Sequence, residues 1–362
     1  MSIAKVARTR KQESIAPQPI DADLRAVPKK PLIQRLLAHT ATWVFLVDVA
    51  LILAFGLLSE QQSFWSLANI QSLLLGGTQA LLLALGLALL LGAGVFDFSL
   101  GANLVLSSVT GGLTVQAIAG PYDPQGVYSD VGYALLAGFV VAIVTGTLFG
   151  LANGLIISLL DINPLIATLG TMGIGTGIAL VITNGGNISG LPSQIQSAIG
   201  LNMIGGVLPL PTLVALVVAA LVTLLLKYTR FGMRSLAMGS SRTAAERAGI
   251  KTRRQTIQLT MIAGAFAGLA GYIDLARFGS TSASGHTQDA LNAIAAVIIG
   301  GTLLVGGRVS ILGAIFGTIL AVVLQTGLVI IGVQAYWQLI AVGAVLIIAI
   351  AIDRFRYTLQ KA

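Results

Sequence analysis

The chain has 362 residues, of which 56% are hydrophobic and only 9% are charged, and its net charge is +8. No lysine or arginine occurs between Arg35 and Lys227. A soluble domain of this size needs cations on its surface, whereas a charged side chain at the centre of a bilayer costs roughly 3 kcal/mol or more. The composition therefore excludes a soluble protein and indicates a chain that crosses the membrane many times. The absence of cysteine excludes disulfides and thiol chemistry.

Apolar runs of about 20 residues, the length that crosses ~30 Å of hydrocarbon, predict an all-α protein with about ten membrane-spanning helices. The predicted spans are 42–59, 70–92, 99–119, 131–159, 164–183, 210–228, 256–277, 289–306, 309–332 and 335–352. The fourth span is long enough to require a tilt. The eighth contains several glycines, so it is either a full helix or a broken one.

The sequence on either side of these spans divides the chain into three parts. A basic arm, 1–41, precedes the membrane domain, 42–352, and a short tail, 353–362, follows it. Lysine and arginine concentrate in cytoplasmic loops, so the arm, the basic loop 227–255 and the tail are all predicted to be cytoplasmic. An even number of spans agrees with this placement of both termini. Contact with anionic lipid explains the arm better than contact with nucleic acid does.

Glycines recur at intervals of four residues in three of the predicted spans, which predicts that their helices pack closely. The positions are Gly146, Gly150 and Gly154, then Gly264 and Gly268, then Gly313 and Gly317.

Several common catalytic patterns are missing from the sequence. It contains no Gly-x-x-x-x-Gly-Lys-Ser/Thr phosphate loop, no Gly-x-Ser-x-Gly and no His/Cys cluster. Its two histidines, His39 and His286, have no partner at metal-ligand spacing and are predicted to be interfacial polar residues. We therefore expect no enzymatic activity, bound cofactor or metal in this chain.

A polar, basic stretch from Lys227 to Gln258 separates two strongly apolar halves. Within it, Ser241–Ala248 predicts a short helix, with Ser241 as its N-cap and Gly249 as its C-terminal stop. A capped helix of this kind suits docking to another protein. From the pattern alone, a solvated loop explains the stretch equally well.

Asp97 lies between two long apolar runs, and an ionisable residue in such a place is a functional candidate. It either caps the third span or shapes a gate there, or it contacts a solute in the pathway. Asn163 and Pro164 predict the N-cap and first turn of the fifth span. Asp48 and Asp274 are expected near opposite membrane faces.

Six stretches carry a resemblance to a known family. They are the polar loop 230–250, Phe96–Gly101, Ile166–Met172, Thr183–Gly185, Gly268–Gly271, and Ala293–Thr302 followed by Gly306 and Gly307. Their order and spacing resemble the permease subunits of bacterial ABC importers of the ribose/xylose/arabinose class, within a wider family that includes branched-chain amino-acid permeases. The resemblance implies the type II importer fold, with ten helices per subunit.

The resemblance also implies partners and sites. Two permease subunits, expected to be identical, would assemble with ABC ATPases, which bind ATP and Mg²⁺, and with a periplasmic or extracytoplasmic solute-binding protein. ATPase coupling is then expected at Ser241, Arg242, Ala244, Ala245, Glu246 and Gly249. The candidate pathway or gate residues are Asp97, Ser99, Thr168, Thr171 and Asn184. The hydroxyls of Thr168 and Thr171 share one helix face, where they either meet a polyol or bond to their own helix carbonyls.

The chain departs from the family pattern at three places. Ser240, Ser241 and Arg242 stand where the family has Gly-Asn and then Glu, and the glutamate of this chain is shifted to Glu246. Asn292 stands where an aspartate is usual, and Phe96 and Phe98 replace aliphatic residues. The lost glutamate affects the polar details of docking rather than its location.

The function expected from the residues and the resemblance together is that of a permease in the bacterial cytoplasmic (inner) membrane. It would import a small neutral solute, a monosaccharide in the first instance, with energy from the partner ATPases. The nearest alternative is a branched-chain amino-acid permease. An ion-coupled secondary transporter acting alone is a third reading, and it requires carboxylates and coupling sites in the middle of the membrane.

Overall fold

The computed structural model describes residues 40–120, 128, 130–283, 285–286 and 288–334, with scattered positions between 337 and 348. The basic arm up to residue 39, His39, most of the predicted tenth span and the tail lie outside the described residues. Eight of the described helices are long and apolar enough to cross a membrane, which confirms the all-α polytopic fold class. They are α2 (Thr40–Leu58), α3 (Leu67–Gly92), α4 (Leu100–Ala119), α5 (Val131–Leu159), α6 (Pro164–Thr183), α7 (Leu210–Tyr228), α10 (Thr252–Phe278) and α12 (Ile311–Ile330).

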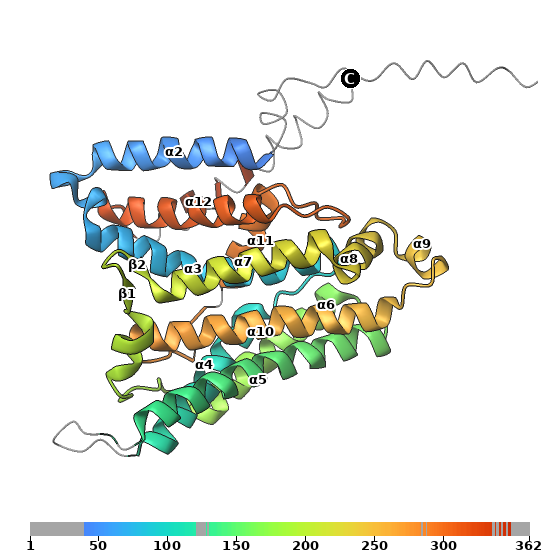
Figure 1. Ribbon diagram of the computed structural model, residues 1–362, viewed down its shortest axis with the longest axis horizontal. Helices are drawn as coiled ribbons and strands as arrows, with labels where there is room; N and C mark the ends of the chain where they lie inside the picture. Colours follow the sequence, from blue (N-terminus) through green and yellow to red (C-terminus); the bar gives the residue numbers. More distant parts are fainter. Residues whose placement is uncertain are drawn as a thin grey trace, which may run out of the picture.

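The long helices lie side by side, and their connections gather at the two ends of the bundle (Figure 1). One end carries α8 (Arg230–Ser240) and α9 (Arg242–Arg247), and we call it the α9 end. The opposite end carries β1 (Met203–Ile204) and β2 (Leu208–Pro209), an antiparallel pair that forms a small hairpin, and we call it the β1 end. The other shorter described helices are η1 (Glu60–Trp65), η2 (Gln196–Gly200) and α11 (Asp289–Ile299).

The centre of the bundle is formed by α3 and α10. The run Leu81–Leu91 of α3 is buried on all sides, and α10 packs against α3, α4 and α5. A helix that is apolar all round belongs in such a position. In contrast, α2 and α6 leave most of their apolar side chains exposed, as helices that face hydrocarbon or another membrane subunit do.

The predicted glycine faces meet one another. A Cβ atom at Gly146 would clash with the carbonyl oxygen of Gly264, and one at Gly150 would clash with that of Thr260. Gly317 of α12 likewise approaches the backbone of Ala296. Close backbone approach through glycine therefore joins α5 to α10 and α12 to its neighbour α11, as the spacing of four predicted.

The predicted eighth span is a half-helix. Here α11 covers only Asp289–Ile299, about 16 Å at 1.5 Å per residue, which is too short to cross the hydrocarbon. It ends at Gly300 and Gly301, where Gly301 has a φ of 90° that favours glycine. Of the two readings that the sequence left open, the broken helix is confirmed.

Two of the three predicted helix starts are confirmed by hydrogen bonds. The Ser241 hydroxyl accepts from the Ala244 N–H at 3.3 Å, and the Asn163 side chain accepts from the Leu165 N–H at 2.9 Å. The third, at Asp97, belongs to the candidate site and is described there. The sequence did not predict α8, which begins where the Thr229 hydroxyl accepts from the Gly232 N–H at 3.1 Å.

Asp48 and Asp274 are each 2% exposed, so both side chains are buried inside the bundle, and their position near opposite membrane faces stays a prediction. Asp48 lies within α2 and faces the interior, and neither of its oxygens has a hydrogen-bond partner among the described residues. Asp274 lies near the end of α10, but Gln79 of α3 and His286 cover it and bind it. The sequence shows where each residue lies along its helix, but it does not show which neighbouring elements bury its side chain.

We expect Gly150→Ala to destabilise the protein, because the added methyl group must displace the backbone of Thr260. Overpacking of this kind costs about 1–3 kcal/mol. Thermal unfolding of the purified protein in detergent measures the loss. Gly132→Ala in the same helix is the matched control, since nothing lies within 4 Å of the atom it adds. Equal melting temperatures for the two variants would contradict the close α5–α10 contact.

Candidate functional site

The α9 helix is a short, exposed elbow at one end of the bundle. Arg242 and Glu246 form an ion pair at 3.4 Å on its surface, with side chains 45% and 51% exposed. Ala244 is exposed, whereas Ala245 is buried against the protein at 4% exposure. Gly249 ends the elbow with a φ of 79°, a left-handed conformation in which glycine pays no steric penalty.

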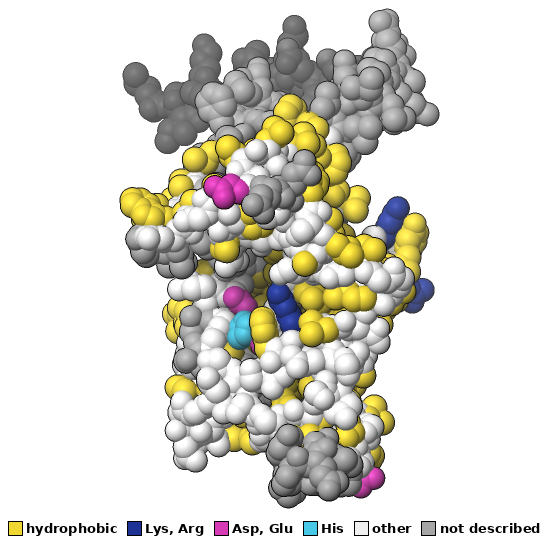
Figure 2. Space-filling view, turned by 90° about the vertical axis from the view of Figure 1, so that its left-hand side faces the viewer, with side chains coloured by type: hydrophobic (Ala, Val, Ile, Leu, Met, Phe, Trp, Pro, Cys, Tyr) yellow, Lys and Arg dark blue, Asp and Glu magenta, His cyan; other side chains and the backbone are white. Residues whose placement is uncertain are grey.

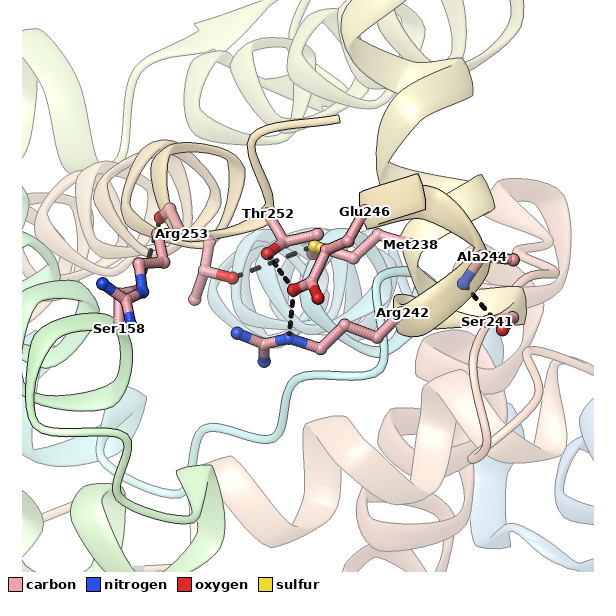
Figure 3. Close-up of polar contacts among 9 residues, drawn as sticks. Ser158, Met238, Ser241, Arg242, Ala244, Glu246, Thr252 and Arg253 are labelled. Carbon is pink, nitrogen blue, oxygen red and sulfur yellow. Dashed lines mark hydrogen bonds and ion pairs between the residues drawn. The ribbon is translucent and has the colours of Figure 1, made fainter. Parts of the chain in front are cut away.

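Glu246 also ties the elbow to the first residue of α10. Its carboxylate accepts a hydrogen bond from the Thr252 hydroxyl at 2.7 Å, and in Figure 3 it lies between Thr252 and Arg242. The hydrogen bond from Thr252 and the contact with Arg242 hold the pKa of the Glu246 carboxyl below its usual range. The elbow therefore presents a fixed ionic surface joined directly to a central helix of the bundle.

Side chains of α10 hold α8 in the same way, and the sequence did not reveal them. The Gln255 amide donates to the Phe231 carbonyl at 3.0 Å and to the Ser235 hydroxyl at 2.8 Å. Gln255 and Ser235 are 6% and 0% exposed. Ser235 and Gln255 lie 20 residues apart on different helices, so only the tertiary contact identifies them as a pair.

A junction of glycines connects α8 to the membrane helices. The Gly307 N–H donates to the carbonyl oxygen of Gly92, the last residue of α3, at 2.9 Å. Gly239 of α8 fits between these two residues, where a Cβ atom would clash with the Gly92 oxygen and approach the Gly307 nitrogen to 2.6 Å. Three backbones thus meet without intervening side chains, so α8 is in direct contact with α3 and with the α11–α12 connection.

The α3–α4 turn, which follows Gly92, carries a buried polar network. Asp97 is 1% exposed, and its Oδ1 accepts from the Ser99 N–H at 2.8 Å and from the Ser99 hydroxyl at 2.5 Å. Asn153 of α5 donates to the Ser99 hydroxyl at 2.7 Å and to Asp97 Oδ2 at 3.4 Å. The N-cap residue of α4 is Ser99 and not Asp97. Asp97 instead orders the turn before α4 through the N–H and hydroxyl of Ser99. Asn153 is a member of this network that the sequence did not indicate.

The structure brings Thr168 to this network and leaves Thr171 and Asn184 apart from it. The Thr168 hydroxyl accepts from the Phe98 N–H at 3.2 Å and donates to the Pro164 carbonyl at 2.8 Å. Thr171 donates to the carbonyl of Thr168 at 3.3 Å. Both hydroxyls thus bond to their own helix, the alternative to a polyol contact. Asn184 ends α6 in a left-handed conformation, φ 51°, at the far end of that helix.

These contacts form a continuous mechanical connection. It runs from the exposed elbow through α8 and the glycine junction to the α3–α4 turn, and from there to α5 through Asn153 and to α6 through Thr168. Among the described residues, no group of three or more His, Cys, Asp or Glu side chains is arranged to hold a metal ion. The arrangement joins the exposed elbow to α10, α3, α5 and α6 through direct contacts.

Replacing Asp97 tests the buried network. Asp97→Leu leaves the Ser99 N–H, the Ser99 hydroxyl and the Asn153 amide without their shared acceptor. We expect a loss of stability on the order of 1–3 kcal/mol, since an orphaned buried donor costs about that much. Asp97→Asn keeps one acceptor oxygen and should lose less. Thermal unfolding of both variants measures the difference, and a leucine variant as stable as the wild type would contradict this role.

Comparisons with known proteins agree with this architecture. Residues 69–350 match the model of a family described as the permease component of the branched-chain amino acid transport system. The galactose/methyl galactoside import permease protein MglC of Haemophilus influenzae is 32% identical over 86% of this chain and 94% of its own length. The ribose import permease protein RbsC of Bacillus subtilis is 34% identical over 75% of this chain and 80% of its own.

A third relative is the D-allose transport system permease protein AlsC of Escherichia coli, 30% identical over 86% of this chain and 90% of its own length. No solved structure matches the chain. The family match covers most of the described helices, and the three relatives align over 80% to 94% of their own length. The chain therefore belongs to the family of branched-chain amino acid transport system permease components.

Proposed function

We propose that this chain is the membrane-spanning subunit of an ATP-driven importer for a monosaccharide. Two copies form the pathway, an ABC ATPase docks at the α9 end, and an extracytoplasmic solute-binding protein delivers the solute at the β1 end. ATP and Mg²⁺ are bound by the ATPase and not by this chain. The single observation that carries the proposal is the exposed α9 elbow, tied to α10 by Glu246 and Thr252 and joined to the transmembrane helices through the glycine junction.

Charge supports this orientation in the bacterial inner membrane. The segment 227–255 carries eight cations, namely Lys227, Arg230, Arg234, Arg242, Arg247, Lys251, Arg253 and Arg254. The described connections at the β1 end carry few charges, among them Glu60 and Asp130. Because positively charged loops remain in the cytoplasm, the α9 end faces the ATPases. The N-terminal arm and the tail then lie on the same side.

The mechanism follows the contacts between the elbow and the helices. Closure of the ATPases on ATP pushes on α9, and Glu246 and Gln255 carry the motion to α8 and α10. The glycine junction passes it to the α3–α4 turn. From that turn the Asp97 network reaches α5 and α6. Because α6 exposes much of its apolar surface, we assign it to the boundary with the second permease subunit and the pathway.

The relatives and the composition favour a neutral sugar. Their names specify galactose, ribose and allose, whereas the family description names branched-chain amino acids. The described part of α6 contains no charged side chain that could bind the ammonium or carboxylate group of a zwitterion. Aromatic residues are only 6% of the chain, so stacking on the sugar is slight and tight binding resides in the binding protein.

Reconstitution tests the function. Proteoliposomes containing this chain, its ATPase and its binding protein should accumulate a radiolabelled monosaccharide only when ATP is present on the side of the α9 end. Galactose, ribose, allose and leucine are compared as solutes. Omitting the ATPase or the binding protein should abolish uptake. Uptake by this chain alone, or ATP-dependent uptake of leucine in preference to all three sugars, would contradict the proposal.

A pair of variants on α8 tests whether the glycine junction couples the elbow to the membrane helices. Gly239→Val fills the glycine junction, and a clash of about 1–3 kcal/mol corresponds to roughly 5- to 150-fold in an equilibrium. We expect uptake to fall within that range while the ATPase still co-purifies. Ala237→Val adds apolar carbons at an exposed position two residues earlier and should leave uptake unchanged. Equal uptake by the two variants would remove the junction from the mechanism.

A further inference from the structure

The connection between α10 and the half-helix α11 contains a histidine bound on both sides. The His286 ring lies 2.7 Å from Asp289 Oδ2 through Nδ1 and 3.2 Å from Asp274 Oδ2 through Nε2. Asp274 also accepts a hydrogen bond from the amide of Gln79 in α3. His286 therefore joins α10 to α11 directly and reaches α3 through Asp274, whereas the sequence predicted only an ordinary polar residue at a membrane boundary.

The two carboxylates, one at each ring nitrogen, determine the protonation state of this histidine. A neutral imidazole has one N–H, so one of the carboxylates would face a nitrogen lone pair. An imidazolium donates to both carboxylates, and charge-assisted hydrogen bonds of this kind are among the stronger ones in proteins. The bridge therefore requires the protonated ring.

The surroundings favour that state. Burial lowers the pKa of His286, but the hydrogen bonds and charges of Asp274 and Asp289 outweigh it and raise the pKa to about 10. Arg277 of α10 is the other charged group at this site, and it lies beside Gly76 of α3. The described residues of α4 are uncharged. Two carboxylates thus balance two cations.

The cluster is reached from the β1 end. Figure 2 looks onto this end and shows a histidine between acidic and basic side chains in the middle of the face. The side chains of His286 and Asp289 are 20% and 33% exposed, and that of Asp274 is 3% exposed. The bridge therefore extends from the surface of the β1 end to a buried carboxylate.

The backbone of the connection is held at both of its ends. Thr281 and Ile188 exchange two backbone hydrogen bonds of 3.0 and 3.1 Å. The carbonyl oxygen of His286 packs where a Cβ atom at Gly101 would clash, at the start of α4. His286 has a φ of 61°, a left-handed conformation that costs a non-glycine residue about 1–3 kcal/mol and persists only where its surroundings impose it.

We infer that His286 is a positioning residue for transport, which fixes the start of α11 against α3, α4 and α10 by bridging Asp274 and Asp289. The role in transport rests on the proposed function, whereas the bridge itself rests on the contacts described above. The start of α11 lies beside Gly101, two residues after Ser99 of the Asp97 network. Loosening the bridge therefore disturbs the β1 side of that network while the α9 end keeps its contacts.

The first test measures the connection without any solute. The chain has no cysteine, and Ala283 is 2% exposed, so Ala283→Cys gives one protected thiol near the bridge. Adding His286→Gln should raise its labelling by a membrane-impermeant maleimide on the order of tenfold, because the segment opens more often. Glu60→Gln, an acid-to-amide change at an exposed position of the β1 end, is the control and should change nothing. Labelling unaffected by His286→Gln would overturn the inference.

The second test separates the charged bridge from simple packing. A histidine whose folded pKa is about 10, against about 6.5 unfolded, contributes stability that is complete below pH 6.5 and is lost as the pH rises through 10. The melting temperature of the wild type should therefore exceed that of His286→Gln by an amount that shrinks between pH 6.5 and 10. A difference independent of pH would contradict the imidazolium bridge.

Transport supplies the last readout. His286→Gln should lower the maximal rate of sugar uptake several-fold with the ATPase still bound. The double variant Asp274→Asn/His286→Gln removes the buried charge left by the single one, so it should recover abundance without recovering uptake. Uptake by the double variant at the wild-type rate would overturn the positioning role. A wild type that takes up no sugar contradicts the proposed function instead, and the labelling and pH results still decide the bridge.

Discussion

The free-energy cost of placing a charge in hydrocarbon determines how this chain is arranged. It confines lysine and arginine to the residues before 36 and after 226, and it collects eight of them in the segment around α8 and α9. The same cost requires a partner for most charges inside the bundle, and Asp97 has Ser99 and Asn153 while Asp274 has Gln79 and His286. Where a partner is missing, as at Asp48, the carboxyl side chain is buried against apolar neighbours, and nothing in the described residues explains it.

Contact between helix backbones provides the stiffness that this arrangement needs for mechanical work. Where glycine allows two helices to touch, as in α5 against α10, the helices move together because interiors at this density do not deform continuously. The junction of Gly92, Gly239 and Gly307 extends this contact beyond the membrane helices to α8. In the proposed mechanism, this contact would carry force from the elbow to the α3–α4 turn without relying on flexible side chains.

Periodicity and local turn chemistry made much of this structure predictable. Long apolar runs located the eight described spans, and Ser241, Asn163 and Gly249 predicted helix ends from their own side chains or backbone. Tertiary contacts were not predictable in this way. Asn153 and Gln255 are polar residues inside helices, and only the fold brings them to Ser99 and Ser235. Likewise, only the fold brings His286 to Asp274. The burial of Asp274 was not predictable for the same reason, because it depends on the α10–α11 connection, which folds back toward α3.

The proposed ATP-driven mechanism depends most directly on the claim that the α9 elbow faces the cytoplasm. Ala244→Cys places a single thiol on the exposed face of α9, and Val207→Cys places one at the β1–β2 turn, where Val207 is 49% exposed. With a membrane-impermeant maleimide on intact cells, the account predicts labelling at position 207 only, and labelling at 244 once the cells are opened. Labelling of Ala244→Cys in intact cells as fast as that of Val207→Cys would contradict the account.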